Sequence, residues 1–226
     1  TGAHTLTLTV THASGELGTI EPIADIGRVC REARVPFHVD ASNTAGFIPL
    51  DVAEIGVDLL TLSPHMFYGP KGIGALYSDR RVRPAPLMEG GSQEERRRPG
   101  TENVPLIVGM GKACALTQRD IHQRNKRLAT LRDRLLEGLD SLRGVRITGH
   151  RTRRLPHQAS CLIDHVDGES VLLSLIVGSN LYAASGSACS SRSGQPSHVL
   201  EAIGLGPDVS TGALVFGLGI ETTPEE

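Results

Sequence analysis

Apolar residues in the first half of the chain recur at strand spacing in some segments and at helical spacing in others, and the two kinds of segment alternate along the chain. Residues 5–10, 35–39 and 57–62 form short apolar or alternating runs that are typical of β-strands. Between the first two runs, apolar side chains at helical spacing predict a helix that begins near Glu21 and Pro22. Strands that alternate with helices predict right-handed crossovers and a mostly parallel sheet. Ligands of such sheets bind beyond the carboxyl ends of the strands.

The second half predicts a long helix followed by a smaller domain. Residues 73–78 are expected to return as an edge strand that could run antiparallel to its neighbour, and residues 84–101 to form a long loop. Residues 104–142 have helical periodicity, with charged residues between apolar positions at Leu128, Leu131, Leu135, Leu136, Leu139 and Leu142. Strands are then predicted over 145–148 and 159–164, a helix over 169–177, a strand from 181, a short helix over 197–203 and a strand over 213–217. The predicted fold class is α/β, with a mostly parallel sheet in residues 1–120 and a smaller α+β domain in residues 121–226.

Composition and charge indicate which kinds of partner, membrane segment and cysteine chemistry to expect of this chain. The 226 residues carry a formal net charge of −2, which gives no reason to expect a nucleic acid as a partner. No run reaches the roughly 18 apolar residues that a membrane-spanning helix needs, and no secretory signal is recognised. The cysteines are widely spaced without a CxxC pair, so no metal site or disulfide framework is expected, and a cytoplasmic location is predicted. Both ends resemble interrupted elements, which predicts a fragment or a truncated gene product.

Polar residues at two predicted strand ends are candidates for a binding site. Asp40 ends a strand that is expected to be buried, where an unpaired carboxylate would be costly. It is either a turn cap or the partner of a protonated ring nitrogen, which pyridoxal-phosphate enzymes require. Ser63 and His65 follow the next strand, and Asn43 follows Asp40. An isolated histidine there is usually a loop hydrogen-bonder, but together these donors suit a phosphate and a phenolic oxygen.

Cys189 is the cysteine predicted to be reactive. It lies in a segment rich in Ser and Gly, where a thiol would be accessible and a thiolate could attack sulfur or carbon electrophiles. Cys30, on the apolar face of the first helix, and Cys161, in a strand, are expected to be small core residues.

Five ordered motifs resemble the cysteine desulfurases of the NifS/IscS type, which have the pyridoxal-phosphate fold of class V aminotransferases. The motifs are residues 38–43 (HVDASN), 63–74 (SPHMFYGPKGIG), 98–104 (RPGTENV), 185–190 (SGSACS) and 222–226 (TTPEE). The resemblance covers nearly the whole chain. It implies that residues 1–120 are part of the cofactor-binding large domain and that residues 121–226 carry the Cys189 segment. It also implies removal of sulfur from L-cysteine, which gives alanine and a persulfide on the protein, for iron–sulfur cluster or thiolation pathways.

The resemblance also implies roles for individual residues. Asp40 would hold the pyridine nitrogen of pyridoxal 5′-phosphate, and Asn43, in place of a glutamine, would stand near the phenolic oxygen. Ser63 and His65 would bind the phosphate. Thr101 would reach the phosphate of the neighbouring subunit's cofactor, which implies a homodimer.

The predicted catalytic set is Cys189 as the persulfide carrier, His65, and the position of Met66. In the family that position holds the Schiff-base lysine, and methionine can neither form a covalent imine nor transfer a proton. Lys71 lies in a Gly-Pro-Lys-Gly turn that the family has beside its true lysine. Cofactor binding is therefore expected to be non-covalent and weakened.

Two further positions depart from the family pattern. Val215 stands where an arginine grips the substrate carboxylate, and a bidentate guanidinium has no substitute in an isopropyl group. Gly15 stands where an asparagine would contact the cofactor.

Three interpretations remain open from the sequence. The first is a desulfurase-like protein that is inactive or impaired because of Met66. The second is a non-catalytic scaffold that pairs with an intact desulfurase or a sulfur acceptor, and the third is a selenocysteine lyase or another class V aminotransferase. The sequence alone leaves enzymatic turnover undecided.

Overall fold

The computed structural model describes residues 6–186, 197–206 and 211–226. The chain forms two compact units. The first comprises residues 1–12 and 21–121, and the second comprises residues 13–20 and 122–226. The predicted domain ranges assign residues 13–20 to the first domain, whereas their contacts belong to the second unit.

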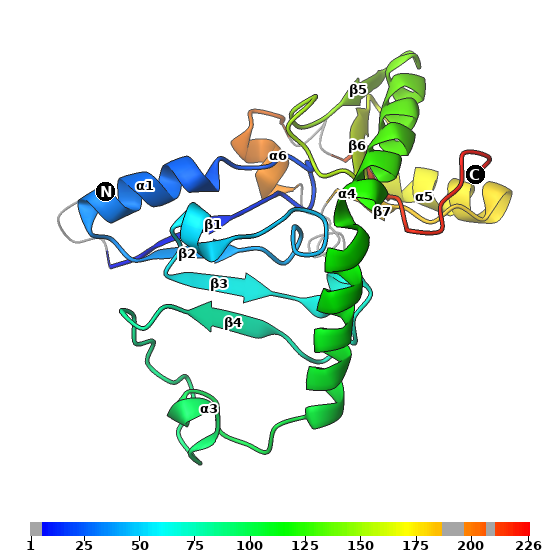
Figure 1. Cartoon of the computed structure of the whole chain (residues 1–226). Helices are drawn as coiled ribbons and strands as arrows, with labels where there is room; N and C mark the ends of the chain where they lie inside the picture. The colour runs from blue at the N-terminus through cyan, green and yellow to red at the C-terminus, as the bar shows by residue number, and fades with distance from the viewer. Residues whose placement is uncertain (1–5, 187–196, 207–210) are drawn as a thin grey trace. The chain divides into compact units, whose positions relative to one another are not determined.

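The first unit contains a four-stranded sheet in the order β1-β2-β3-β4 (Figure 1). Strands β1 (Leu8–Thr11), β2 (Phe37–Asp40) and β3 (Leu59–Leu62) are parallel, and β4 (Ala75–Ser78) runs antiparallel to β3 at the edge. The α/β fold class with a mostly parallel sheet is thus confirmed, and the antiparallel edge strand was also predicted. The predicted strand over residues 5–10 is shifted in the structure, since β1 begins at Leu8.

Two helices pack their apolar side chains against this sheet. Helix α1 (Ile23–Ala33) follows Pro22, which occupies the N-cap, and α2 (Val52–Ile55) is capped by Asp51, whose carboxylate accepts the N–H groups of Ala53 and Glu54. The core between helices and sheet consists of buried side chains from both layers: Ile23, Cys30, Phe37, Val39, Ala41, Ile55, Val57 and Leu60. As predicted, Cys30 is a core residue, and burial raises the pKa of its thiol.

The predicted loop over residues 84–101 includes the short helix α3 (Gln93–Arg96), in which Glu94 and Glu95 have positive φ angles. Helix α4 (Val104–Asp140) then continues from the first unit into the second, because the units divide between Ile121 and His122. The predicted helix over residues 104–142 is therefore confirmed, with an end two residues earlier.

The second unit contains an antiparallel sheet in the order β5-β6-β8-β7. Its strands are β5 (Val145–Ile147), β6 (Gln158–Ile163), β7 (Ala184–Ser185) and β8 (Ala213–Gly217). Helix α5 (Gly168–Ser179) is capped by Asp167, and α6 (His198–Ala202) is capped by Ser197. The strand predicted from residue 181 begins only at Ala184.

Residues 13–20 complete the core of the second unit. Leu17 packs with Leu162, Leu200 and Ala213. The backbone N–H of Leu155 donates to the carbonyl of Gly18 (2.8 Å), and the side-chain amide of Gln158 donates to a carbonyl in the same segment. The segment therefore folds as part of this unit although it directly follows β1.

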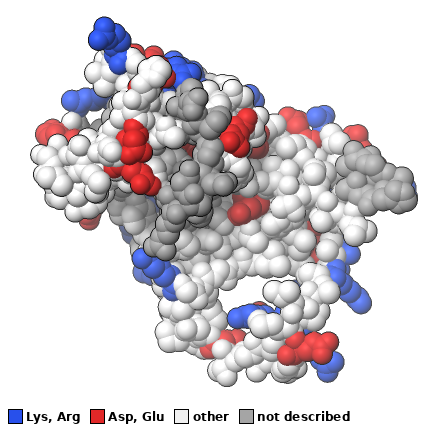
Figure 2. Space-filling view, turned by 180° about the vertical axis from the view of Figure 1, so that it is seen from behind, with Lys and Arg blue, Asp and Glu red and all other residues white. Residues whose placement is uncertain are grey.

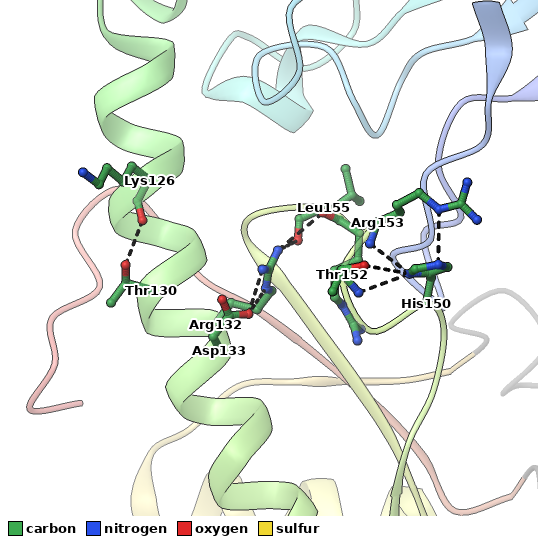
Figure 3. Close-up of polar contacts among 9 residues, drawn as sticks. Lys126, Thr130, Arg132, Asp133, His150, Thr152, Arg153 and Leu155 are labelled. Atoms are coloured by element: carbon green, nitrogen blue, oxygen red, sulfur yellow. Dashed lines mark hydrogen bonds and ion pairs between the residues drawn. The ribbon is translucent and has the colours of Figure 1, made fainter. Parts of the chain in front are cut away.

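Arg132 is a buried charged residue on the long helix. The residue is 6% exposed, because Arg132 shares a helix face with Leu128 and Leu136, both of which are buried. The guanidinium donates to the backbone carbonyl of Leu155 (2.8 Å) and to the carboxylate of Asp133 (2.7 Å), as Figure 3 shows. A buried charge is tolerated here because both kinds of partner are present.

Surface charges of both signs are interspersed on the face that Figure 2 shows, in agreement with a formal net charge of −2. Within the described ranges, no helix is long and apolar enough to cross a membrane. The same residues contain no group of three or more His, Cys, Asp or Glu side chains suited to a metal ion.

Candidate functional site

The parallel strands of the first unit end at a common edge, and Asp40 lies there. Thr11 is paired with Asp40, and Asp40 with Thr61, in the registers of β1–β2 and β2–β3. One carboxylate oxygen of Asp40, Oδ1, accepts the backbone N–H of Ser42 (2.9 Å) and the hydroxyl of Thr61 (3.2 Å). Asp40 is therefore a turn cap through Oδ1, and Oδ2 has no hydrogen-bond partner among the described residues.

Hydrogen bonds hold Asp40 in its ionised form. Burial raises the pKa of the carboxyl, but hydrogen bonds from Ser42 and Thr61, with a smaller contribution from His38, outweigh this and lower it below the usual value. A carboxylate that stays ionised and keeps one oxygen available can receive an N–H from a protonated ring nitrogen. Both interpretations of Asp40 from the sequence, cap and ring-nitrogen partner, are compatible with this geometry.

Ser63 contacts Ser42, whose backbone N–H donates to Asp40. Ser63 is the N-cap residue of the short 3₁₀ helix η1 (Pro64–Phe67), and its backbone is extended (φ −126°, ψ 102°). Its hydroxyl lies 3.1 Å from the hydroxyl of Ser42 instead of capping the helix. The structure thus links the turn after β2 to the turn after β3 by a pair of hydroxyl groups.

A backbone hydrogen bond and close contacts fix the conformation of the loop over residues 63–72. The N–H of Gly69 donates to the carbonyl of Pro64 (2.8 Å), and a Cβ on Gly69 would lie only 2.6 Å from the Cβ of Pro64. Tyr68 has the left-handed conformation (φ 67°), and so has Gly72 (φ 86°). Phe67 is buried against Ala45 and Ala113, which fixes η1 on the first unit.

His65 and Met66 lie on exposed positions of η1. The side chain of Met66 is 38% exposed, and its backbone N–H donates to the carbonyl of Ser63 (3.1 Å). Lys71 and Thr101 are also exposed, and Thr101 precedes α4 in a segment without regular structure. Within the described part of the chain, no hydrogen bond joins Thr101 to Asp40, Ser63 or His65. Asn43, which is half-buried, lies in the turn after β2.

A buried pair, His12 and Thr44, was not predicted as part of the site. The Nδ1 atom of His12 lies 3.0 Å from the Oγ1 atom of Thr44, and both residues are at most 4% exposed. The backbone N–H of His12 donates to the carbonyl of Asp40 (2.9 Å). The signal in the sequence was a histidine two residues after a predicted strand, at the same edge as Asp40.

The predicted residues of the second unit are only partly described. Cys189 lies outside the described residues. Val215 is half-buried in β8, where it pairs with Ser160 and Ala184. Gly15 is exposed, and its carbonyl accepts the side-chain amide of Gln158 (2.6 Å).

Comparison with known proteins agrees with this arrangement. The model of the family "Aminotransferase class-V" matches residues 2–226. The chain belongs to the class V aminotransferase family. Its curated relatives include "Cysteine desulfurase IscS" of Methanosarcina thermophila (45% identical over 222 residues, 98% of this chain and 55% of the relative). The protein of that name from Dictyoglomus turgidum is 44% identical over 223 residues, 98% of this chain and 56% of the relative.

Solved structures show the same relation. A NifS-like protein from Rickettsia africae superposes with a TM-score of 0.88 at 29% identity, over 96% of this chain and 57% of the other. A second NifS-like protein gives 0.86 at 33% identity, over 98% and 57%. The predicted resemblance to the NifS/IscS type is confirmed, and the chain spans little more than half the length of these relatives.

The family depends on pyridoxal 5′-phosphate, and the described residues offer polar groups that suit this cofactor. Asp40 offers an ionised oxygen, and Ser42 and Ser63 offer hydroxyl groups at the neighbouring strand end. Met66 offers no amine.

Proposed function

We propose that this chain is a cysteine desulfurase-like protein whose site holds pyridoxal 5′-phosphate non-covalently. Its desulfurase activity is absent or impaired. The substrate class is L-cysteine, and the products are alanine and a persulfide carried by Cys189. Similarity to IscS proteins over 98% of the chain supports the reaction class. The observation that carries the proposal is Asp40, with one oxygen held by two donors and the other available at the strand end.

Impairment follows from the chemistry of Met66. The cofactor supplies an electron sink for the substrate's Cα carbanion when it is bound. A lysine at this position would supply the proton transfers, and general acid–base groups contribute about 10²–10⁴-fold in rate. A thioether cannot exchange protons, and Lys71 lies five residues further along an exposed turn.

The experiment compares the unsubstituted chain with the Met66→Lys variant, and both proteins are prepared in the same way. Each protein is mixed with pyridoxal phosphate, and the visible absorbance of a lysine imine is followed before and after borohydride reduction. The unsubstituted chain should bind the cofactor without a reducible imine, whereas Met66→Lys should form one. A reducible imine in the unsubstituted chain, located at Lys71 by peptide mass spectrometry, would contradict impairment.

Turnover is measured as sulfide and alanine released from L-cysteine. Met66→Lys should gain activity, and Met66→Lys combined with Cys189→Ser should lose persulfide formation while it still binds the cofactor. If Met66→Lys binds the cofactor covalently and stays inactive, Val215 becomes the larger defect. Adding Val215→Arg tests that directly, because a guanidinium can bind the substrate carboxylate.

A second candidate function is a non-catalytic scaffold, which the combination of Met66 and Val215 favours. This chain would then pair with an intact desulfurase or a sulfur-acceptor protein. Co-purification with either partner, with no cofactor bound and no turnover after Met66→Lys, would support the scaffold. Release of selenide from selenocysteine in preference to sulfide from cysteine would instead indicate a selenocysteine lyase. Another class V aminotransferase would transfer the amino group of its substrate without releasing sulfide.

The setting of the reaction is part of the proposal. A homodimer follows from the implied role of Thr101 at a neighbouring subunit's cofactor. A cytoplasmic location is proposed from the widely spaced cysteines, and delivery of sulfur to iron–sulfur cluster or thiolation pathways from the resemblance. Analytical ultracentrifugation tests the dimer, and a monomer with full cofactor affinity would remove Thr101 from the site.

A further inference from the structure

His12 is a buried histidine at the edge where the candidate site lies. It directly follows β1, is 4% exposed, and its backbone N–H extends the β1–β2 ladder to the carbonyl of Asp40. Its ring reaches Thr44, which is fully buried. Burial lowers the pKa of the imidazole to about 4, so the ring is neutral near pH 7.

The proton positions in this pair follow from a count of donors. The Thr44 hydroxyl carries one proton and lies within hydrogen-bond distance of the carbonyl of Ala41 (3.2 Å) and of Nδ1 of His12 (3.0 Å). If Nδ1 carries the imidazole proton, it donates to Oγ1 of Thr44, and the hydroxyl donates to Ala41. The imidazole proton and the hydroxyl proton then each make one hydrogen bond, and only the lone pair on Nε2 takes no part in this group of hydrogen bonds.

The opposite arrangement is less favourable. If the Thr44 hydroxyl donated to Nδ1, the imidazole proton would sit on Nε2, which has no hydrogen-bond partner among the described residues. The Thr44 hydroxyl would then no longer donate to the carbonyl of Ala41, so one of the two hydrogen bonds in this group would be lost. The geometry therefore favours the Nδ1–H tautomer of His12.

This chain of hydrogen bonds supports the turn that follows Asp40. The carbonyl of Ala41 also accepts the backbone N–H groups of Thr44 (3.1 Å) and Ala45 (2.8 Å), which closes the turn containing Ser42 and Asn43. His12 is the side chain that ties this turn to the end of β1. Because the ring is neutral, it adds no positive charge that would compete for the carboxylate of Asp40.

We propose that His12 is a positioning residue for the cofactor site, which acts as an Nδ1–H donor through Thr44 on the turn that carries Asp40 and Asn43. This role rests on the proposed function, since it concerns binding of pyridoxal phosphate. The neutral imidazole holds the hydroxyl of Thr44 toward Ala41, and the turn keeps the spacing between the Asp40 carboxylate and the Asn43 amide. His12 itself is not expected to touch the cofactor.

The test uses paired substitutions in the full chain. His12→Leu and Thr44→Val each remove the hydrogen bond. His12→Asn keeps a side-chain N–H that can donate to Thr44, and Thr44→Ser keeps the hydroxyl. Thr148→Val is the matched control, because Thr148 is a buried threonine of the second unit. Thermal unfolding is recorded for each variant to confirm folding.

The first measurement is the tautomer of His12 by two-bond ¹⁵N–¹H correlation, which needs no cofactor. The Nδ1–H form is expected in the unsubstituted chain and in Thr44→Ser, and its loss is expected in Thr44→Val. The second is the dissociation constant of pyridoxal phosphate. His12→Leu and Thr44→Val should each raise it about threefold to tenfold, the effect of one hydrogen bond, whereas His12→Asn, Thr44→Ser and Thr148→Val should stay near the value of the unsubstituted chain.

The double variant His12→Leu/Thr44→Val separates positioning from general destabilisation. The effects of two substitutions that remove the same hydrogen bond are not additive. The double variant should therefore bind pyridoxal phosphate no more weakly than the single variant that has the lower affinity. Multiplicative losses, an Nε2–H tautomer in the unsubstituted chain, or unchanged affinity in Thr44→Val would each overturn the role of His12. Absence of cofactor binding by every protein, with the Nδ1–H tautomer intact, would overturn the proposed function and the positioning role with it.

Discussion

Gly27 provides a sharp test of how α1 packs on the first unit. It lies in the middle of α1 and is buried. A Cβ at this position would lie 2.1 Å from the carbonyl oxygen of Ile55, at the end of α2, and 3.5 Å from the ring of Phe37. The contact at Ile55 is with backbone, so a side-chain rotation cannot relieve it, and Gly27→Ala must push the two helices apart.

The magnitude is best taken as a difference between two helical glycines. Gly111, in the same unit on α4, would have no atom within 4 Å of an added Cβ, so Gly111→Ala is the control. Both substitutions gain about 0.8–1 kcal/mol of helix propensity. Only Gly27→Ala incurs the overpacking cost, typically about 1–3 kcal/mol. The difference between the two variants therefore isolates the clash.

Thermal unfolding followed by circular dichroism measures this difference. For a chain of this size, 1 kcal/mol corresponds to about 2–4 °C, so Gly111→Ala should raise Tm slightly and Gly27→Ala should fall roughly 2–12 °C below it. Hydrogen exchange of the β2 amides assigns the loss to the first unit. Equal melting temperatures for the two variants would show that α1 does not approach α2 as closely as the structure has it.

Other predictions concern titration, capping and thiol chemistry. Because the pKa of His12 is about 4 when folded and about 6.5 when unfolded, stability should be complete above pH 6.5 and fall by up to about 3 kcal/mol as pH drops toward 4. Urea unfolding across this range, compared with His12→Asn, checks it. Ser197→Ala should cost about 0.5–2 kcal/mol and expose the first amides of α6 to exchange, and Ser197→Asn should restore protection. Cys114, which is exposed, should react with a thiol reagent in the native chain, whereas Cys30 and Cys161 should react only after denaturation.

Much of the fold could be predicted because each local pattern agreed with the tertiary outcome. The strand that ends in Asp40 and the long helix after residue 104 were recognised from periodicity, and β8 was predicted with its observed ends. Errors arose where tertiary contacts decided the matter. Arg132 is an omission of this kind, because its burial was not predicted and its guanidinium donates to the carbonyl of Leu155 in the second unit.

The sequence indicated candidate residues for a site but not the hydrogen bonds that connect them. The sequence indicated Asp40 and Ser63 separately, since each follows a strand. The hydroxyl contact of Ser42 with Ser63, and the hydrogen bond from the Thr61 hydroxyl to Asp40, depend on the register of β2 with β3. No pattern in the sequence indicated that His12 would meet Thr44, 32 residues away.

The sequence by itself determined the chemistry that this chain can offer. It placed a carboxylate at a strand end and a methionine directly after His65, and no fold can turn a thioether into an amine. The tertiary structure decided which groups act together. Parallel register brought separate strand ends to one edge, and burial then lowered the pKa of His12, while hydrogen bonds outweighed burial at Asp40. The physical reason is that residue types are local properties, whereas desolvation and hydrogen-bond partners arise only when distant segments pack together.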